Sequence, residues 1–131
     1  MKSPIPRIEI SLSQIRENSK KLTDLYIQKG ISIMGVTKAV LGEPSIAKAM
    51  IQGGIQFIAD SRIENIQKMK KAGLSAQFVL LRTPLSQAES IVKDVDISLN
   101  TEIETLKNLS YQAKNQNKIH QVIIMVELGD L

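Results

Sequence analysis

The sequence contains no cysteine and only one histidine, His120. Without cysteine, this chain cannot form disulfides, thiolate zinc sites or a cysteine nucleophile. A Ser-His-Asp triad would have to use His120. No cluster of histidine, aspartate and glutamate has the spacing of metal ligands. No glycine-rich phosphate loop is present either. These absences remove several common classes of catalytic and binding site.

Aromatic residues make up only 3% of the chain, and the net charge is +4 from 17 basic and 13 acidic residues. Few rings are therefore available for stacking on bases. The clustered lysines at 20–21 and 68–71 are typical of solvated helix faces. No apolar run is long enough to cross a bilayer, and the N-terminus lacks the apolar core of a signal peptide. We expect no nucleic-acid or membrane partner and a cytoplasmic location.

Hydrophobic residues make up 43% of the 131 residues, which is enough for one domain with its own core. Residues 7–12 alternate between polar and apolar and predict a strand, and a helix is predicted over 13–29 with Ser13 as its N-cap. The chain then repeats one unit: an apolar run, a polar turn and an amphipathic helix. The apolar runs are the predicted strands 31–40, 55–59, 78–81, 94–99 and 121–126.

Strands that alternate with helices indicate βαβ units and a parallel sheet. The repeat length of roughly 20–25 residues is typical of a (β/α)₈ barrel of about 250 residues. Five units cannot close such a barrel. We therefore expect a partial (β/α)₈, TIM-like barrel, preceded by a strand and a helix, as the N-terminal part of a longer protein. An open doubly wound sheet is the alternative, although the glycine fingerprint of dinucleotide folds is absent.

Barrel enzymes carry their chemistry at the carboxyl ends of the strands, and these ends are polar here. Arg82 directly follows a buried run, where a guanidinium needs an anionic or hydrogen-bonding partner. Asp60 and Asn100 are also common turn residues, and Ser61 and Thr101 fit helix capping. The polar residues at the five strand ends are Thr37, Lys38, Asp60, Ser61, Arg62, Arg82, Thr83, Ser98, Asn100, Thr101, Glu127 and Asp130.

Lys38 differs from the other polar residues because it ends the first long apolar run. Strand alternation places it on the same face as Met34 and Val36. If that face is the barrel interior, the lysine is desolvated, its pKa falls, and its neutral amine becomes a nucleophile. The alternative is a lysine whose amine reaches solvent at the strand end. His120 lies at the other end of its strand, where we expect a surface or capping role.

Motifs along almost the whole chain, in order and at matching spacing, resemble one family. They are Pro6 to Leu12, Val36-Thr37-Lys38-Ala39-Val40, Gly54 to Phe57, Ala59-Asp60-Ser61-Arg62-Ile63-Glu64-Asn65, Leu80-Leu81-Arg82-Thr83-Pro84, Asp96 to Glu102, and Met125 to Leu131. Together they resemble the alanine/ornithine racemase family, and most closely its ornithine racemase-like branch.

The resemblance implies a fold-type III enzyme that depends on pyridoxal phosphate (PLP). Such enzymes have an N-terminal barrel and a C-terminal β domain, and they act as homodimers. Lys38 would form the internal aldimine and act as the base on one face of the substrate Cα, while a tyrosine from the partner subunit serves the other face. Arg82 and Asn100 would bind the cofactor. Asp60 and Glu127 are candidates for the rim or for substrate contacts.

Several residues differ from the pattern of alanine racemases and argue against alanine racemase itself. Ala39-Val40-Leu41-Gly42 replaces the tyrosine-containing segment of alanine racemases, Met125 replaces their modified lysine, and Ser11 replaces an acidic residue. We expect a basic amino acid such as ornithine as the substrate. The rest of the barrel and the C-terminal β domain would lie outside this chain, so these 131 residues alone should be inactive. The alternatives are a non-catalytic PLP-homeostasis barrel, a D-amino-acid aldolase, and a βα module without a cofactor.

Overall fold

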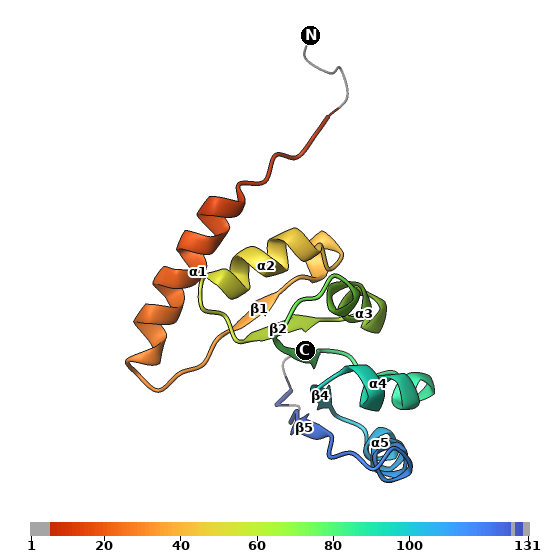
Figure 1. Ribbon diagram of the computed structural model, residues 1–131. Coiled ribbons are helices and arrows are strands. Elements are labelled where there is room, and N and C mark those ends of the chain that lie inside the picture. The colour runs from red at the N-terminus through yellow and green to blue at the C-terminus, as the bar shows by residue number, and fades with distance from the viewer. Residues whose placement is uncertain (1–5, 127, 130–131) are drawn as a thin grey trace.

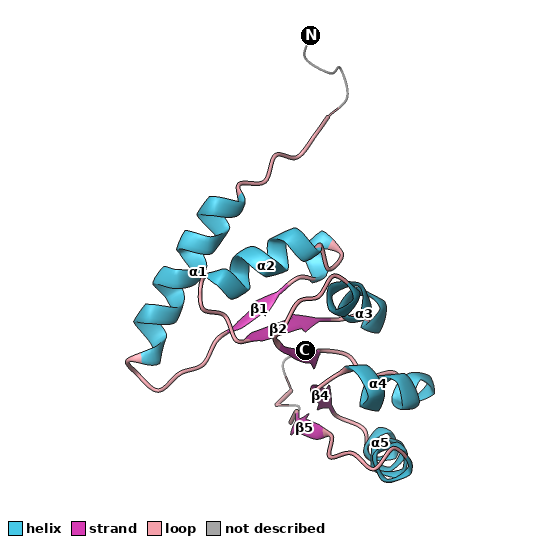
Figure 2. Ribbon diagram, in the orientation of Figure 1, coloured by secondary structure: helices cyan, strands magenta, loops and turns pink. Residues whose placement is uncertain are grey.

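The computed structural model describes residues 6–126, 128 and 129. Figure 2 shows that helices and strands alternate along the chain. The elements, in order, are α1 (Leu12–Ile27), β1 (Met34–Val36), the 3₁₀ helix η1 (Lys38–Val40), α2 (Pro44–Gln52), β2 (Phe57–Asp60), α3 (Ile63–Lys71), β3 (Gln77–Leu80), η2 (Leu85–Gln87), α4 (Ala88–Asp94), β4 (Ile97–Asn100), α5 (Ile103–Asn115) and β5 (Gln121–Ile124).

All five strands are parallel, and each pairs with the next strand along the chain, in the order β1-β2-β3-β4-β5. Helices α2 to α5 follow one another along the outer side of this sheet (Figure 1). A sequential parallel order with helices on one face is the arrangement of a (β/α)₈ barrel, whereas a doubly wound sheet reverses its strand order. The prediction of a partial barrel is therefore confirmed, and the doubly wound alternative is wrong.

The main core lies between the sheet and the helices. Ile58 and Leu80 point from the sheet towards this layer, and the helices bury residues at a spacing of three to four along one face. In α3 these residues are Ile63, Ile66 and Met69. The other face of the sheet holds a smaller apolar cluster, which contains the buried residues Ala59, Val79 and Ile97.

The strand predicted over residues 7–12 is not present. Residues 7–10 pair with no strand within the described part of the chain, and Ile8 is 88% exposed. Helix α1 begins at Leu12, and its N-cap is Ser11 rather than the predicted Ser13, with the Ser11 hydroxyl accepting a hydrogen bond from Gln14 N. An alternating pattern forms a strand only where a neighbouring strand supplies hydrogen bonds, and no strand of the described residues adjoins residues 7–10.

Helix α1 contacts the rest of the fold mainly through α2. The contact does not involve its large apolar residues Leu22 and Leu25, which are exposed. The contact runs instead through Ser19 and Gly53, where a Cβ atom at Gly53 would lie 2.5 Å from both Arg16 O and Ser19 Cβ. Among the described residues, no helix combines the length and apolar character needed to span a bilayer.

We predict that Ile58→Ala lowers the free energy of unfolding by about 2–5 kcal/mol, because Ile58 is 0% exposed and its removal leaves a cavity in the main core. Ile119→Ala is the matched control, since Ile119 is 97% exposed and should change stability by less than about 0.5 kcal/mol. Urea unfolding with equal m-values measures both. Equal effects of the two substitutions would contradict this placement of the core.

Candidate active site at the carboxyl ends of the strands

Lys38 lies at the carboxyl edge of the sheet, just after β1. The strand ends at Val36, earlier than predicted, and Lys38 opens the 3₁₀ helix η1. The lysine is exposed rather than desolvated, and Met34 and Val36, the strand residues whose face the alternation assigned to it, are 41% and 42% exposed. Within the part of the chain that the structure describes, the Lys38 amine has no hydrogen-bond or ion-pair partner. The amine is thus accessible to solvent and forms no interaction with the described residues.

Thr37, the residue before this lysine, is fully buried and hydrogen-bonded on every polar atom. Its N–H donates to Ala59 O at 2.9 Å, which extends the β1–β2 ladder by one bond. Its hydroxyl donates to Asp60 Oδ2 at 2.8 Å. Its carbonyl oxygen accepts from Val40 N at 3.0 Å and from Gly42 N at 3.2 Å, which closes the turn that carries Lys38.

Asp60 faces the helix layer and not the mouth of the barrel. Its carboxyl group is fully buried, and besides the Thr37 hydroxyl it accepts from Arg62 N at 3.0 Å and from Asn65 Nδ2 at 2.9 Å. The structure therefore places this rim candidate inside the fold. The capping predicted for Ser61 is wrong, because α3 begins after Arg62 and the Asp60 carboxyl group accepts the Arg62 N–H. Aspartate bonded to the backbone two residues on is a common turn signal.

The capping predicted for Thr101 is also wrong, because Thr101 is not the N-cap of α5. Helix α5 begins one residue later than that pattern requires, with Glu102 at its N-cap and no side-chain cap bond.

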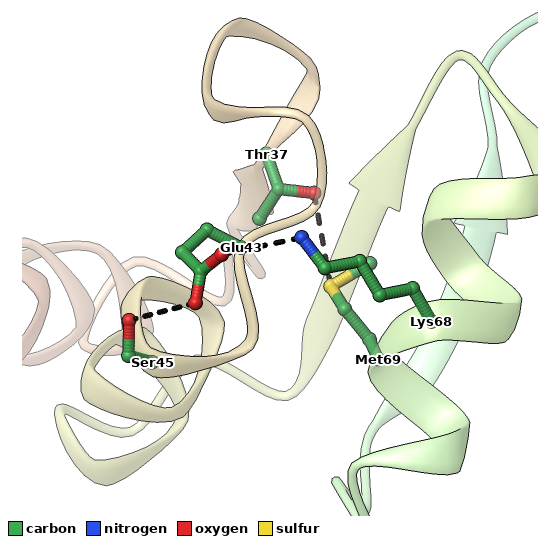
Figure 3. Close-up of polar contacts among 5 residues, drawn as sticks. All are labelled: Thr37, Glu43, Ser45, Lys68 and Met69. Carbon is green, nitrogen blue, oxygen red and sulfur yellow. Dashed lines mark hydrogen bonds and ion pairs between the residues drawn. The ribbon is translucent and has the colours of Figure 1, made fainter.

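The loop after Lys38 is held against α3. Leu41 and Gly42 both adopt left-handed backbone conformations, with φ of 52° and 60°. Lys68 Nζ lies 3.2 Å from Glu43 Oε2, and the Ser45 hydroxyl donates to Glu43 Oε1 at 3.2 Å (Figure 3). The hydrogen bond from the Lys68 ammonium lowers the pKa of Glu43 below its usual value of 4.5. This exposed ion pair ties the end of the loop to the helix.

Arg82 and Asn100 meet at an open cavity of about 330 Å³ beside the ends of β3 and β4. Arg82 is exposed and has no hydrogen-bond or ion-pair partner among the described residues. Asn100 is only 3% exposed, and its Nδ2 donates to Ser98 O at 2.9 Å and to Ser98 Oγ at 3.0 Å. This orientation leaves the buried Asn100 Oδ1 without a partner in the described chain. Lys38 does not line this cavity.

His120 lies just before β5, at the amino end of the strand, as predicted. Its Nε2 is 2.8 Å from the Ser98 hydroxyl, and burial lowers the pKa of His120 below 6.5. Ser98 is 0% exposed, so no substrate reaches this hydroxyl and the pair is not a triad nucleophile. The described residues hold no group of three or more potential metal-ligating side chains. Glu127 and Asp130, the polar residues predicted at the fifth strand end, lie outside the described residues.

Thr37, Gly42 and Asn65 are the supporting residues whose roles the sequence pattern did not show. A glycine after a left-handed turn and an asparagine five residues after an aspartate are weak signals. Their meaning depends on the contact between the β1 loop and α3, and that contact joins residues far apart in the chain.

Residues 10–131 match the family of the alanine racemase N-terminal domain. A lysine racemase of Thermotoga maritima is 35% identical over 127 residues, which cover 96% of this chain and 36% of the relative. An ornithine racemase of Acetoanaerobium sticklandii is 40% identical over 127 residues, which cover 96% of this chain and 35% of the relative. The chain thus spans about a third of the length of these curated relatives.

Solved structures share the fold. An alanine racemase from Streptomyces coelicolor A3(2) matches with a TM-score of 0.77 over 90% of this chain and 32% of that chain, at 15% identity. A D-threonine aldolase from Filomicrobium marinum matches with a TM-score of 0.75 over 90% of this chain and 33% of that chain, at 14% identity. At these identities the likeness establishes the barrel fold and not the reaction.

We predict that Lys68→Met raises the pKa of Glu43 towards 4.5, because it removes the ammonium donor. Because the pKa of Glu43 is lowered, the ion pair stabilises the fold fully at pH values above the pKa that Glu43 has in the unfolded chain. This contribution is lost as the pH falls through the lower pKa of the folded state. A carbon-13 NMR titration of the Glu43 carboxyl group measures the change. Lys71→Met, on the same helix, is the control and should leave the titration unaltered; an unaltered titration in Lys68→Met would refute the pairing.

Proposed function

Because the chain belongs to the family of the alanine racemase N-terminal domain, we propose that it is the N-terminal barrel part of a PLP-dependent amino-acid racemase. The observation that carries the proposal is the Lys38 amine at the carboxyl end of β1, which is exposed and has no partner among the described residues, on a loop that buried contacts hold in place. Residues 1–131 form this part, and the remaining barrel units and a C-terminal β domain lie outside it.

The residues present fit PLP. Lys38 would hold the cofactor through Nζ. Arg82 would pair with an anionic group of the cofactor or substrate, since its guanidinium has no partner among the described residues. Asn100 would accept a hydrogen bond at Oδ1, which is buried without a partner in the described chain. When bound, PLP supplies the electron sink that makes the substrate Cα proton removable.

Racemisation requires a proton to leave one face of Cα and another to arrive on the opposite face. Lys38 Nζ serves one face, and the group for the second face comes from outside this chain. A chain of these 131 residues alone is therefore inactive and binds PLP weakly. The cytoplasmic location stays a prediction, and subcellular fractionation tests it.

We propose a basic amino acid such as ornithine as the substrate. The lysine racemase and the ornithine racemase, which are 35% and 40% identical to this chain, are both named after a basic amino acid. Cleavage of a D-amino acid is a second candidate, since a D-threonine aldolase has the same barrel fold and the fold alone does not distinguish the two reactions. A non-catalytic PLP-homeostasis barrel is the third. Chiral chromatography of the products from ornithine, lysine, alanine and D-threonine separates the three.

We predict that PLP followed by borohydride labels Lys38 in the full-length protein that carries this chain, and that Lys38→Ala lowers racemisation by about 10²–10⁴-fold. Borohydride makes the attachment irreversible, so peptide mass spectrometry locates it. Lys71→Ala is the matched control, because Lys71 is also exposed but lies at the end of α3. Label on other lysines, with none on Lys38, would overturn the proposal.

We predict that the 131-residue chain self-associates. Within the described residues β1 and β5 each pair on one side only, and apolar side chains are exposed on both, including Val36 at 42% and Ile124 at 63%. Covering such edges and apolar area favours association. Light scattering over a range of concentrations measures it, and Ile124→Lys should weaken it. A single monomeric species at high concentration would contradict the expectation; the complete enzyme is proposed to be a homodimer.

A further inference from the structure

We infer that Asp60 and Asn65 are positioning residues for Lys38, acting through Thr37 on one side of the lysine and Gly42 on the other. The inference rests on the proposed function, since it concerns the same amine. Asp60 is enclosed in the fold, and Asn65 Nδ2 is turned to Asp60, so neither is assigned a contact with substrate. Their effect passes through the backbone of the loop.

The Asp60 carboxyl group holds the residue before Lys38. It is 0% exposed and has three donors: the Thr37 hydroxyl, Arg62 N and Asn65 Nδ2. A buried carboxyl group that loses a donor is left unsatisfied, so each of the three is held firmly. Thr37 is also bonded through its N–H to Ala59 O. The backbone just before Lys38 is therefore held in place by a hydrogen bond to β2 and by a hydrogen bond to the Asp60 carboxyl group.

Asn65 holds the backbone that leaves the turn. Gly42 is buried with φ of 60°, and a Cβ atom there would lie 2.6 Å from Asn65 Cβ and 3.0 Å from Asn65 O. This approach leaves no room for a side chain at position 42. Gly42 N also donates to Thr37 O, which closes the loop onto the residue that Asp60 holds.

The two contacts come from one βα unit, the end of β2 and the first turn of α3. They enclose residues 38–41, and Lys38 has no side-chain partner of its own among the described residues. Its amine is therefore directed only by the backbone. A residue that fixes that backbone sets where the amine can meet PLP, although it takes no part in the chemistry.

Two matched pairs of variants test the inference in the full-length protein. Thr37→Val removes the hydroxyl at constant shape, whereas Thr37→Ser retains it. Gly42→Ala places a Cβ against Asn65. Gly73→Ala carries similar backbone strain, at φ of 77°, but its Cβ would meet no described residue within 4 Å other than its chain neighbours. The probe is PLP with borohydride, and the readout is the ratio of label on Lys38 to label on Lys71, measured by peptide mass spectrometry as a function of pH.

We expect Thr37→Val and Gly42→Ala to lower the Lys38-to-Lys71 ratio by about tenfold and to shift its pH profile, while Thr37→Ser and Gly73→Ala stay close to the unsubstituted protein. Circular dichroism identifies variants that keep the fold. If Gly42→Ala and Thr37→Val do not fold, Asn65→Ala is the milder variant, since it removes only the donor to Asp60.

An unchanged ratio and pH profile in folded Thr37→Val, Gly42→Ala or Asn65→Ala would overturn the inference and leave Asp60 and Asn65 with a purely structural role. If the unsubstituted protein itself shows no preference for Lys38 over Lys71, the proposed function fails, and the inference fails with it. The two failures are therefore distinguishable in one set of measurements.

Discussion

Parallel pairing of each strand with the next one along the chain is the constraint on which the site depends. It sends every carboxyl end to one edge of the sheet and every connecting helix to one face. Lys38 and Arg82 follow β1 and β3, Asn100 is the last residue of β4, and the three share an edge for this reason alone. The same pairing leaves the opposite face of the sheet with only a small apolar cluster, around Ala59, Val79 and Ile97.

At that edge, a buried carboxyl group organises its surroundings. Burying Asp60 without donors would be costly, and the donors that satisfy it come from the end of β1 and from the start of α3. Satisfying the carboxyl group therefore joins two consecutive βα units. The hydrogen bonds to Asp60 are enclosed in the fold and hold the loop. The Lys38 amine, which belongs to the residue after Thr37, stays exposed and has no partner in the described chain.

The cavity at Arg82 and Asn100 has the opposite character. Its polar groups are left with unmet hydrogen-bonding capacity in the described residues, a guanidinium on one side and a buried amide oxygen on the other. Unmet donors and acceptors of this kind suit recognition of a polar ligand, whereas the satisfied network around Asp60 suits support. The polar residues at the strand ends thus fall into two groups: Arg82 and Asn100, which are suited to binding a ligand, and Asp60 with its donors, which support the loop. Amino-acid composition alone does not separate these groups.

The sequence by itself determined the repeating strands and helices, because their signals are local: Ile63, Ile66 and Met69 lie on one helical face wherever that helix is placed. It also indicated that Lys38 lies at the end of the first strand, whereas the structure showed that this strand ends earlier, at Val36. The alternation at residues 7–12 was an equally local signal and misled, since a strand needs a partner. Only the tertiary structure decided that Asp60 turns inward and that Gly42 packs on Asn65. Both depend on packing between segments distant in sequence, where burial and close contact override turn and capping preferences.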